Sequence, residues 1–331
     1  MILSFDAPEV RFAVQAAQLA ASVVQRVQKD LAARALDKGD RSPVTVADFA
    51  SQAVVAALLE RAFPNDVLVA EEDAATLRTP QGEPLRTLVT RYVRQHFPLA
   101  SGAQVLDWID RGRGDPGERF WTLDPIDGTK GFLRGDQYAV ALALVYRGRV
   151  EIGVLACPHL QEARMMHSSG PGTLALAVYG LGAWWSDMKG TLVWEPLQVS
   201  RQGDPSQARI LRSFESGHTN ADQVQALAEA LGVTVEPVCL DSQAKYVLLA
   251  AGEGEIYVRL LSPQKPDYKE KIWDQAAGSL IIQEAGGQVT DLDGRPLNFR
   301  TGRSLTDNRG VVATNGVLHR AALEALRRIG A

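Results

Sequence analysis

The sequence has few of the residues that support thiol, disulfide or imidazole chemistry. Its 331 residues include only two cysteines, Cys157 and Cys239, which lie far apart and form no CxxC pair, and only five histidines. We therefore expect neither a zinc site of paired cysteines or an HExxH helix nor a triad built around a nucleophile elbow. Cysteine usage of this kind favours a reducing compartment, and we predict a cytoplasmic protein.

The chain also lacks a strong net charge and an uninterrupted apolar run. A formal net charge of -4 gives it no general attraction to nucleic-acid backbones or anionic membranes. Three charged side chains among the first eleven residues do not fit a signal peptide. Residues 168–186 are uncharged and long enough for a membrane span, but glycines and a proline divide them. We predict short strands there.

Apolar residues make up 46% of the chain, which is enough for a substantial core and suggests two domains. The polar segment 201–208 is the candidate boundary, so we predict α/β domains over residues 1–204 and 205–331. Periodicity predicts helices over residues 10–36, 45–63, 221–231, 243–251 and 274–284, and strands over residues 67–70, 120–123, 138–146, 150–156 and 256–260 and near residue 235. This order predicts α/β layers packed together.

The segment WTLDPIDGTKG, residues 121–131, places two aspartates at the end of a predicted strand. Pro125 restricts the backbone between Asp124 and Asp127, so both carboxylates are held in place before a ligand arrives. Paired carboxylate oxygens suit a hard divalent cation, and the amides of Gly128 and Thr129 are placed to meet a phosphate oxygen. The alternative is an ordinary aspartate-rich turn.

Further acids occupy comparable positions. Glu71 ends an apolar strand, Asp48 sits just inside a helix start, and Asp274 opens a predicted helix. Favourable interaction with the helix dipole is an alternative explanation for Asp274. Because the candidate ligands are all carboxylates, the sequence favours Mg²⁺ over zinc.

These motifs resemble those of the lithium-sensitive, magnesium-dependent phosphatases that include inositol monophosphatase and fructose bisphosphatase. The matching segments are VAEE at residues 69–72, WTLDPIDGT at residues 121–129 and IWDQAAGSLIIQEAGG at residues 272–287. They occur in the family's order, and the resemblance covers nearly the whole chain. It implies a layered α-β-α-β-α sandwich.

Within that superfamily the chain resembles the 3′(2′),5′-bisphosphate nucleotidase branch. The segments that carry this resemblance are SPVTVADFASQ (residues 42–52), TKGFLRGDQYAVAL (residues 129–142), ESGHT (residues 215–219) and DSQAKYVLLAAGEGEIYVRL (residues 241–260). Inositol monophosphatases usually carry an acid at the position of Arg259 and lack a cation at that of Lys245. Two cations suit a substrate that keeps a second phosphate. The alternative is that both are surface cations.

The resemblance also implies roles for individual residues. One Mg²⁺ is assigned to Glu71, Asp124 and the carbonyl of Ile126, and a second to Asp124, Asp127 and Asp274, with a third ion near Glu71 left open. Thr129, hydrogen-bonded to Asp48, would orient the attacking water, and Asp48 would take its proton. The substrate would be bound by Gly128, Thr129, Ser216, Gly217, His218, Ser242, Lys245 and Arg259.

The implied reaction converts 3′-phosphoadenosine 5′-phosphate to AMP and phosphate, with 3′-phosphoadenosine 5′-phosphosulfate as a candidate second substrate. The alternatives are an inositol mono- or bisphosphatase and a catalytically silent nucleotide sensor on the same fold. The expected partner is thus a small nucleotide bisphosphate, without nucleic acid or membrane. The choice between monomer and dimer, and sensitivity to Li⁺, stay open.

Overall fold

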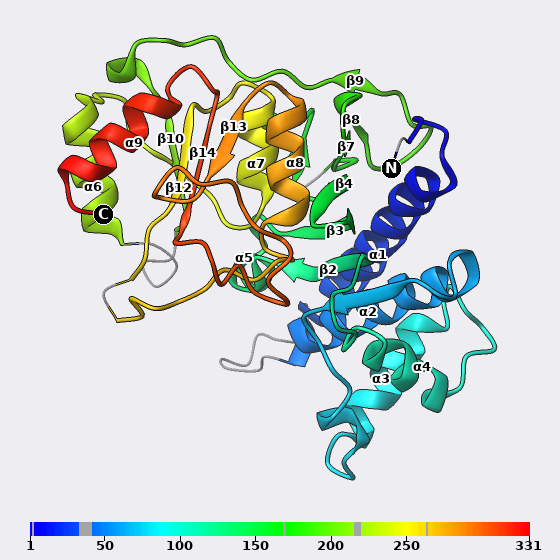
Figure 1. Ribbon diagram of the computed structural model, residues 1–331. Helices are drawn as coiled ribbons and strands as arrows, with labels where there is room; N and C mark the ends of the chain where they lie inside the picture. Colours follow the sequence, from blue (N-terminus) through cyan, green and yellow to red (C-terminus); the bar gives the residue numbers. More distant parts are fainter. Residues whose placement is uncertain (2, 33–41, 168–169, 215–219, 263) are drawn as a thin grey trace.

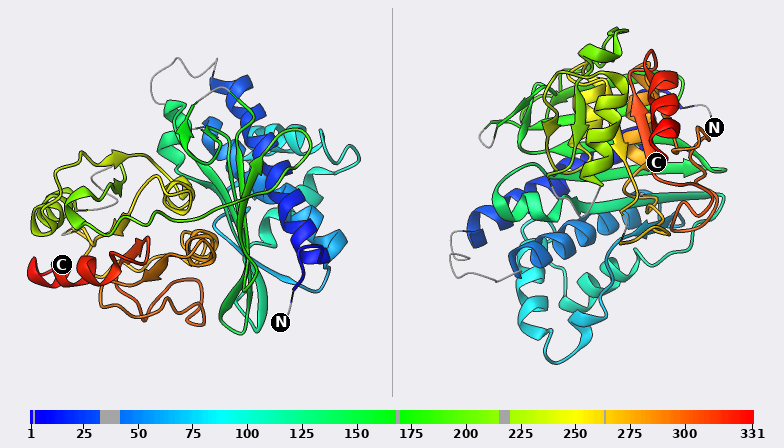
Figure 2. Two further views of the ribbon diagram at one scale, coloured as in Figure 1. Left: turned by 90° about the horizontal axis from the view of Figure 1, so that it is seen from above. Right: turned by 90° about the vertical axis from the view of Figure 1, so that its left-hand side faces the viewer.

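The structure of the protein is a computed structural model. It describes residues 1, 3–32, 42–167, 170–214, 220–262 and 264–331. Its helices and sheets alternate in five layers, seen edge-on in the left view of Figure 2 and labelled in Figure 1. Two helices cover one face of a large sheet, two more separate it from a smaller sheet, and a final pair covers the smaller sheet. The predicted α-β-α-β-α sandwich is confirmed.

In the described chain, the larger sheet has seven strands in the order β1-β2-β3-β4-β7-β8-β9. Their bounds are Val67–Ala70, Arg119–Asp127, Ala139–Tyr146, Arg149–Cys157, Thr173–Val178, Gly182–Asp187 and Glu195–Pro196. Only β1 and β2 pair in parallel, and the other neighbours are antiparallel. The ends of β1 and β2 therefore meet at one edge of the sheet.

Helices α1 (Pro8–Ala32) and α2 (Ser42–Ala62) cover the outer face of this sheet. The described side chains of α2 are buried almost all round because α2 also contacts α3 (Glu83–Val93) and α4 (Gly102–Asp110). The helix begins at Ser42, three residues earlier than predicted, with Pro43 near its start, where the missing N–H needs no partner. The short helices η1 (Thr76–Arg78) and α5 (Thr129–Arg134) complete this half.

The middle layer consists of α7 (Ala244–Ala250) and α8 (Ala276–Glu284). Gly153 of β4 lets α8 approach the sheet, since a Cβ there would lie 2.7 Å from the carbonyl oxygen of Ala277. The predicted start of α8 was wrong by two residues. Asp274 lies in the preceding turn, where its N–H donates to Lys271 O at 3.2 Å, so a place in the first turn of the helix does not explain it.

The smaller sheet has the order β11-β10-β12-β14-β13 in the described chain, with bounds Val238–Cys239, Ile210–Arg212, Ile256–Arg259, Val311–Thr314 and Gln288–Thr290. Helices α6 (Ala221–Leu231) and α9 (His319–Arg328) pack on its far face. Strand β11 lies three residues after the strand predicted near residue 235. The remaining elements are the hairpin of β5 (Leu160–Gln161) and β6 (Met165–Met166) and the short helix η2 (Pro205–Gln207).

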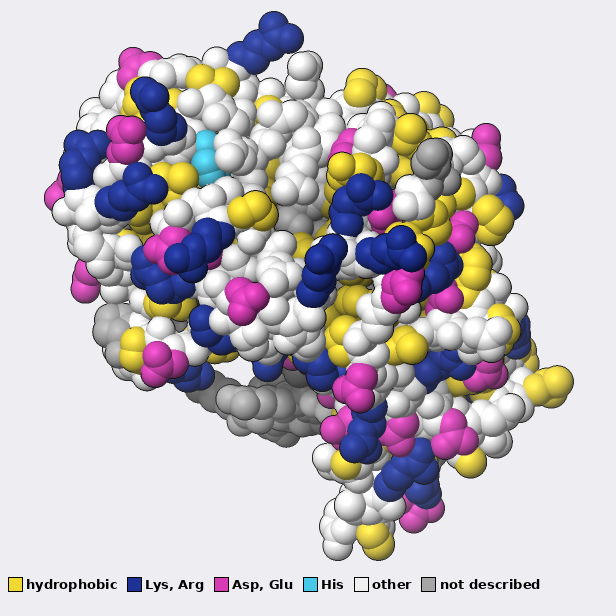
Figure 3. All heavy atoms as spheres, viewed as in Figure 1, with side chains coloured by type: hydrophobic (Ala, Val, Ile, Leu, Met, Phe, Trp, Pro, Cys, Tyr) yellow, Lys and Arg dark blue, Asp and Glu magenta, His cyan; other side chains and the backbone are white. Residues whose placement is uncertain are grey.

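The two sheets come from residues 67–196 and 210–314, and the division between residues 204 and 205 stays a prediction. Within the described residues, no helix is long and apolar enough to cross a membrane. The described part of the uncharged stretch forms the hairpin of β7 and β8. On the face shown in Figure 3, basic and acidic side chains are interspersed.

Candidate active site between the two sheets

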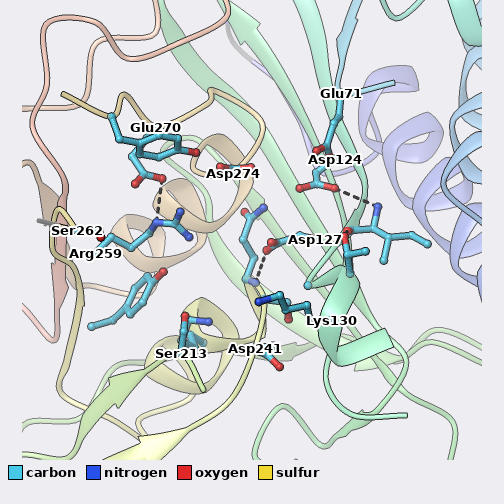
Figure 4. A pocket seen from close by; sticks show the side chains of 18 of the residues that line it. Glu71, Asp124, Asp127, Lys130, Ser213, Asp241, Arg259, Ser262, Glu270 and Asp274 are labelled. Atoms are coloured by element: carbon cyan, nitrogen blue, oxygen red, sulfur yellow. Dashed lines mark hydrogen bonds and ion pairs between the residues drawn. The ribbon is translucent and has the colours of Figure 1, made fainter. Parts of the chain in front are cut away.

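The parallel pairing of β1 with β2 brings two of the predicted acids together. Ala70 pairs with Leu123, so Glu71 and Asp124 are the next residues of adjacent strands. Their carboxyl groups are close enough to share a hydrogen bond, and Figure 4 shows them at one wall of the cavity. Two separate strand ends thereby deliver one pair of carboxyl groups.

The Asp-Pro-Ile-Asp segment is the irregular end of β2, where the sequence predicted a turn after a shorter strand. The register with β3 shifts between Asp124 and Asp127, and pairing resumes at Asp127 with Ala139. Pro125 has no N–H to donate and lies within this irregularity, where a ladder bond is not required. The Oδ1 atom of Asp124 accepts from the Ile126 N–H at 3.0 Å, which fixes the first carboxylate.

A cavity of about 500 Å³ opens beside this strand end, between the two sheets. The predicted residues that line it are Glu71, Asp124, Ile126, Asp127, Gly128, Thr129, Ser242, Lys245, Arg259 and Asp274. Ser216, Gly217 and His218 lie outside the described residues. Asp48 is not among the lining residues and lies buried on α2.

Burial and mutual repulsion oppose ionisation of the acids. Burial, and then the neighbouring charges of Glu71, Asp127 and Asp274, raise the pKa of Asp124 well above its usual value. The pKa of Glu71 is also raised, by surrounding protein atoms and by Asp127, although the residue as a whole remains exposed. Burial also raises the pKa of Asp274.

This donor set fits a hard divalent cation. Among the described residues, no three His, Cys, Asp or Glu side chains are already grouped at metal-binding spacing. The four carboxyl groups of Glu71, Asp124, Asp127 and Asp274 nevertheless face one cavity, and oxygen atoms of this kind are what Mg²⁺ prefers. A cation would also relieve the repulsion that raises the pKa of Asp124.

The predicted hydrogen bond between Thr129 and Asp48 was wrong for this structure. The Thr129 hydroxyl instead donates to the carbonyl oxygen of Ile126, at a long 3.5 Å, because α5 starts directly after the left-handed Gly128 and turns its first side chain back toward β2. Burial, and then the charges of Glu72 and Glu71, raise the pKa of Asp48.

The predicted cations line the same cavity as the acids and are not surface residues. Lys245 is 2% exposed, and its ammonium donates to Leu240 O at 3.0 Å. Its burial lowers the pKa to about 8. Arg259 forms an ion pair with Glu270 at 2.8 Å. The interpretation of Lys245 and Arg259 as cations on a solvated face was therefore wrong.

Ser242 lies beside these cations in a left-handed conformation, with φ of 67°. Its hydroxyl accepts from the Ala244 N–H at 3.2 Å, so it also shapes the start of α7. The chain reverses here to bring Gln243 toward Asp127, which makes the unusual backbone part of the site.

Several residues of the cavity were missed by sequence reasoning. Glu270 lines the cavity and holds both Arg259 and the side-chain amide of Gln275, at 2.8 Å each. Gln243 donates its backbone N–H to Asp127 and its side-chain Nε2 to Trp273 O at 3.0 Å. Gln243 follows the predicted Ser242 and Glu270 precedes Asp274 by four positions, but neither shows a periodic or charge pattern in the sequence that would single it out.

The model of the inositol monophosphatase family matches residues 6–331. The chain belongs to this family. A 3′(2′),5′-bisphosphate nucleotidase of Emericella nidulans is 40% identical, with 95% of this chain and 96% of that protein covered. A relative of the same name from Oryza sativa is 42% identical, with 97% and 94% covered.

Solved structures show the same fold. An IMPase from Thermotoga maritima aligns with a TM-score of 0.65 at 18% identity, covering 98% of each chain. CysQ from Bacteroides thetaiotaomicron, described as a bacterial member of the inositol monophosphatase family, gives 0.60 at 20% identity and covers 92% of this chain and 96% of its own. At these identities the likeness establishes the layered architecture alone.

Proposed function

We propose that the protein is a Mg²⁺-dependent phosphatase that removes the 3′-phosphate of 3′-phosphoadenosine 5′-phosphate, giving AMP and phosphate. The observation that supports this most directly is a single cavity that four acids line together with two cations, the buried Lys245 and the half-buried Arg259. The names of the relatives, which are about 40% identical over nearly the whole chain, point to the same substrate class. The sulfated analogue is a second proposed substrate.

The metal assignment rests on the carboxyl groups of the cavity. One ion would be held by Glu71, Asp124 and the carbonyl of Ile126, and the other by Asp124, Asp127 and Asp274, with a third near Glu71. Bound there, Mg²⁺ supplies positive charge to the attacking and leaving oxygens and makes a bound water more acidic.

The chain itself orients the reactants and receives the proton. Gly128 and Thr129 line the cavity at the start of α5, and their amides would bind the transferred phosphate. The Thr129 hydroxyl exchanges its long bond to Ile126 for one to the attacking water. Asp48 is buried on α2 outside the cavity lining, and it would take the proton by way of the Thr129 hydroxyl once that side chain turns from Ile126 toward it.

The remaining phosphate of the substrate would bind at the two cations of the cavity. Lys245 and Arg259 supply its counter-charges, Ser242 a hydroxyl, and Ser216, Gly217 and His218 complete the nucleotide site. Glu270 keeps Arg259 in place in the absence of substrate. A substrate with a single phosphate leaves these cations without a partner.

The test is phosphate release from a panel of substrates, with and without Mg²⁺. We expect Mg²⁺-dependent turnover with the highest kcat/KM for 3′-phosphoadenosine 5′-phosphate, and AMP as the product. Inositol phosphates and fructose 1,6-bisphosphate should be poorer substrates. Preference for an inositol phosphate would overturn the substrate assignment, and binding without turnover would identify a silent nucleotide sensor.

A further inference from the structure

Arg303, in the segment between β13 and β14, is bonded to both of the chain segments that deliver acids to the cavity. Its backbone carbonyl accepts from the Ile272 N–H at 3.2 Å. Beside it, Ser304 bridges to Lys271 through the backbone and accepts from the Lys271 ammonium at 3.2 Å. The backbone of Arg303 is thus tied to the segment that leads directly into Asp274.

The side chain of Arg303 reaches the segment on the other side of the site. Its guanidinium donates to Gly112 O at 3.2 Å, to Gly114 O at 3.1 Å and to Ala70 O. Ala70 is the last residue of β1 and immediately precedes Glu71. It is held in turn by Gly112, whose carbonyl accepts from the Ala70 N–H at 2.8 Å. One side chain therefore fixes the backbone from which Glu71 projects.

The guanidinium also packs against the residue next to Asp274. Its central carbon lies 5.1 Å from the ring centroid of Trp273, a side chain that is only 6% exposed. A cation over an indole face at this distance is attractive. The carbonyl of Trp273 accepts from the side-chain amide of Gln243 at 3.0 Å. Contacts to the indole ring and to the carbonyl of Trp273 therefore hold the turn that carries Asp274.

We propose that Arg303 is a positioning residue that sets the separation between Glu71 and Asp274, and through it the affinity of the site for divalent cations. This inference rests on the metal assignment of the proposed function. Arg303 does not line the cavity, so it acts through the two acid-bearing segments and does not touch the substrate. A planar guanidinium satisfies three carbonyls and an aromatic face together, which a lysine ammonium cannot do.

Arg300 provides a matched control in the same segment. Its guanidinium also crosses to the larger sheet, where it donates to Arg147 O at 3.0 and 2.8 Å. Arg147 lies in the turn between β3 and β4, away from the acids. Arg300→Met and Arg303→Met thus remove the same kind of contact between the same two regions, but only the second frees the acid-bearing segments.

The experiment is calorimetric titration of the metal-stripped full-length protein with Mg²⁺, with the unfolding temperature measured alongside. We expect Arg303→Met to raise the Kd for Mg²⁺ about 10- to 100-fold, as found when groups that hydrogen-bond metal-ligand segments are removed. Arg303→Lys should fall between wild type and Arg303→Met. Arg300→Met should stay within about twofold of wild type. At saturating Mg²⁺, kcat and the KM for the nucleotide should change little in Arg303→Met.

The outcomes separate this inference from the proposed function. A wild-type protein that neither binds nor needs Mg²⁺ would overturn the proposed function and the role of Arg303 with it. A wild type that binds Mg²⁺, with an Arg303→Met variant that binds it equally well, would overturn the role of Arg303 alone. If Arg303→Met does not fold, Arg303→Lys decides, and an unchanged Kd in that variant refutes the proposal.

Discussion

Burial and neighbouring carboxyl groups raise the pKa values of Glu71, Asp124 and Asp274, the three acids whose ionisation the cavity opposes most visibly. Carboxyl groups that are gathered to bind a cation repel one another when no cation is bound, and this repulsion favours their protonated forms. Variants that remove charge should therefore separate function from folding.

Asp124→Asn should lower kcat by more than about a hundredfold, because it removes a ligand shared by both proposed ions. It should not lower the unfolding temperature of the metal-stripped protein, because the buried residue loses a repelled charge. Phosphate release and thermal unfolding measure the two effects. Asp293→Asn, in a surface turn, is the control and should change neither. Near-wild-type turnover in Asp124→Asn would contradict the metal assignment.

Lys245 predicts a pH dependence of substrate binding. Its pKa is lowered to about 8, so the ammonium is charged below that pH and loses its charge as the pH rises through it. The KM for the bisphosphate should accordingly rise between about pH 7 and pH 9. For a substrate with one phosphate it should stay nearly flat.

Lys245→Arg provides the check on this prediction, because a guanidinium keeps its charge throughout the range. The KM of this variant for the bisphosphate should be independent of pH between 7 and 9, whatever its absolute value. An unchanged rise in KM would assign the titration to another group.

The sequence was enough to predict the acids but not the residues that hold them. Glu71 and Asp124 could be found because each ends an apolar strand, and the burial of Lys245 and Arg259 makes their place in the cavity consistent with the prediction. Gln243 and Arg303 could not, because their bonds to Asp127 and to Ala70 join positions that only the packing of the two sheets brings together. Contacts of that kind leave no local pattern.

At the scale of elements, the junction of β2 with α5 decides where the amides of the site point. Gly128 has φ of +92°, and a Cβ there would lie 2.8 Å from the Cβ of Ser242. Gly135, at the other end of α5, has φ of +76° with open space around it. The two glycines share a conformational requirement and differ in packing.

Gly128→Ala should therefore be worse than Gly135→Ala. We expect Gly135→Ala to lower the free energy of unfolding by about 1 kcal/mol, with kcat retained. Gly128→Ala adds a clash with Ser242, so it should lower that free energy by about 2–4 kcal/mol and reduce kcat as well. Urea unfolding and phosphate release measure both variants. Equal effects of the two substitutions would show that the approach of Ser242 is unimportant.

The ends of a helix or strand could be predicted where the sequence pattern stops abruptly. They could not be predicted where contacts with distant residues determine the last residue of the element. The α6 helix has the predicted bounds because Asn220 caps it and Gly232 ends it. The start of α8 was predicted two residues early because the N–H groups of Asp274 and Gln275 donate to the carbonyls of Lys271 and Ile272, which keeps both residues in a turn before the helix. The extension of β2 to Asp127 depends on pairing with β3, which the segment alone does not reveal.

At the scale of the whole molecule, the acids couple folding to pH and to metal. Burial, followed by Glu71 and Asp73, raises the pKa of Glu72 to about 7, and Asp48, Asp124 and Asp274 are shifted in the same direction. A carboxyl group with a raised pKa in the folded state stabilises the fold below its unfolded value, near 4 to 4.5. That contribution is lost as the pH rises toward the folded value.

The metal-stripped protein should therefore become less stable between about pH 5 and pH 8, with a fall in unfolding temperature of about 5 °C or more. Saturating Mg²⁺ should raise the unfolding temperature more at pH 8 than at pH 5, because ionised carboxylates bind it. Differential scanning calorimetry across this range measures both trends. A metal-stripped protein that gains stability as the pH rises would contradict the charge arrangement described for the cavity.

The layered fold could be predicted from the order of strands and helices, together with the family resemblance. How tightly the two sheets close on the acids could not, because it depends on contacts between layers such as the side chain of Arg303 on Ala70 and the backbone N–H of Gln243 on Asp127.

Anomalous diffraction from crystals soaked in Mn²⁺, which substitutes for Mg²⁺ at oxygen-rich sites, tests the account most directly. We predict peaks in contact with Asp124, one also bound by Glu71 and another by Asp127 and Asp274. An anomalous map with no peak among these four carboxylates, at a Mn²⁺ concentration that supports turnover, would contradict it.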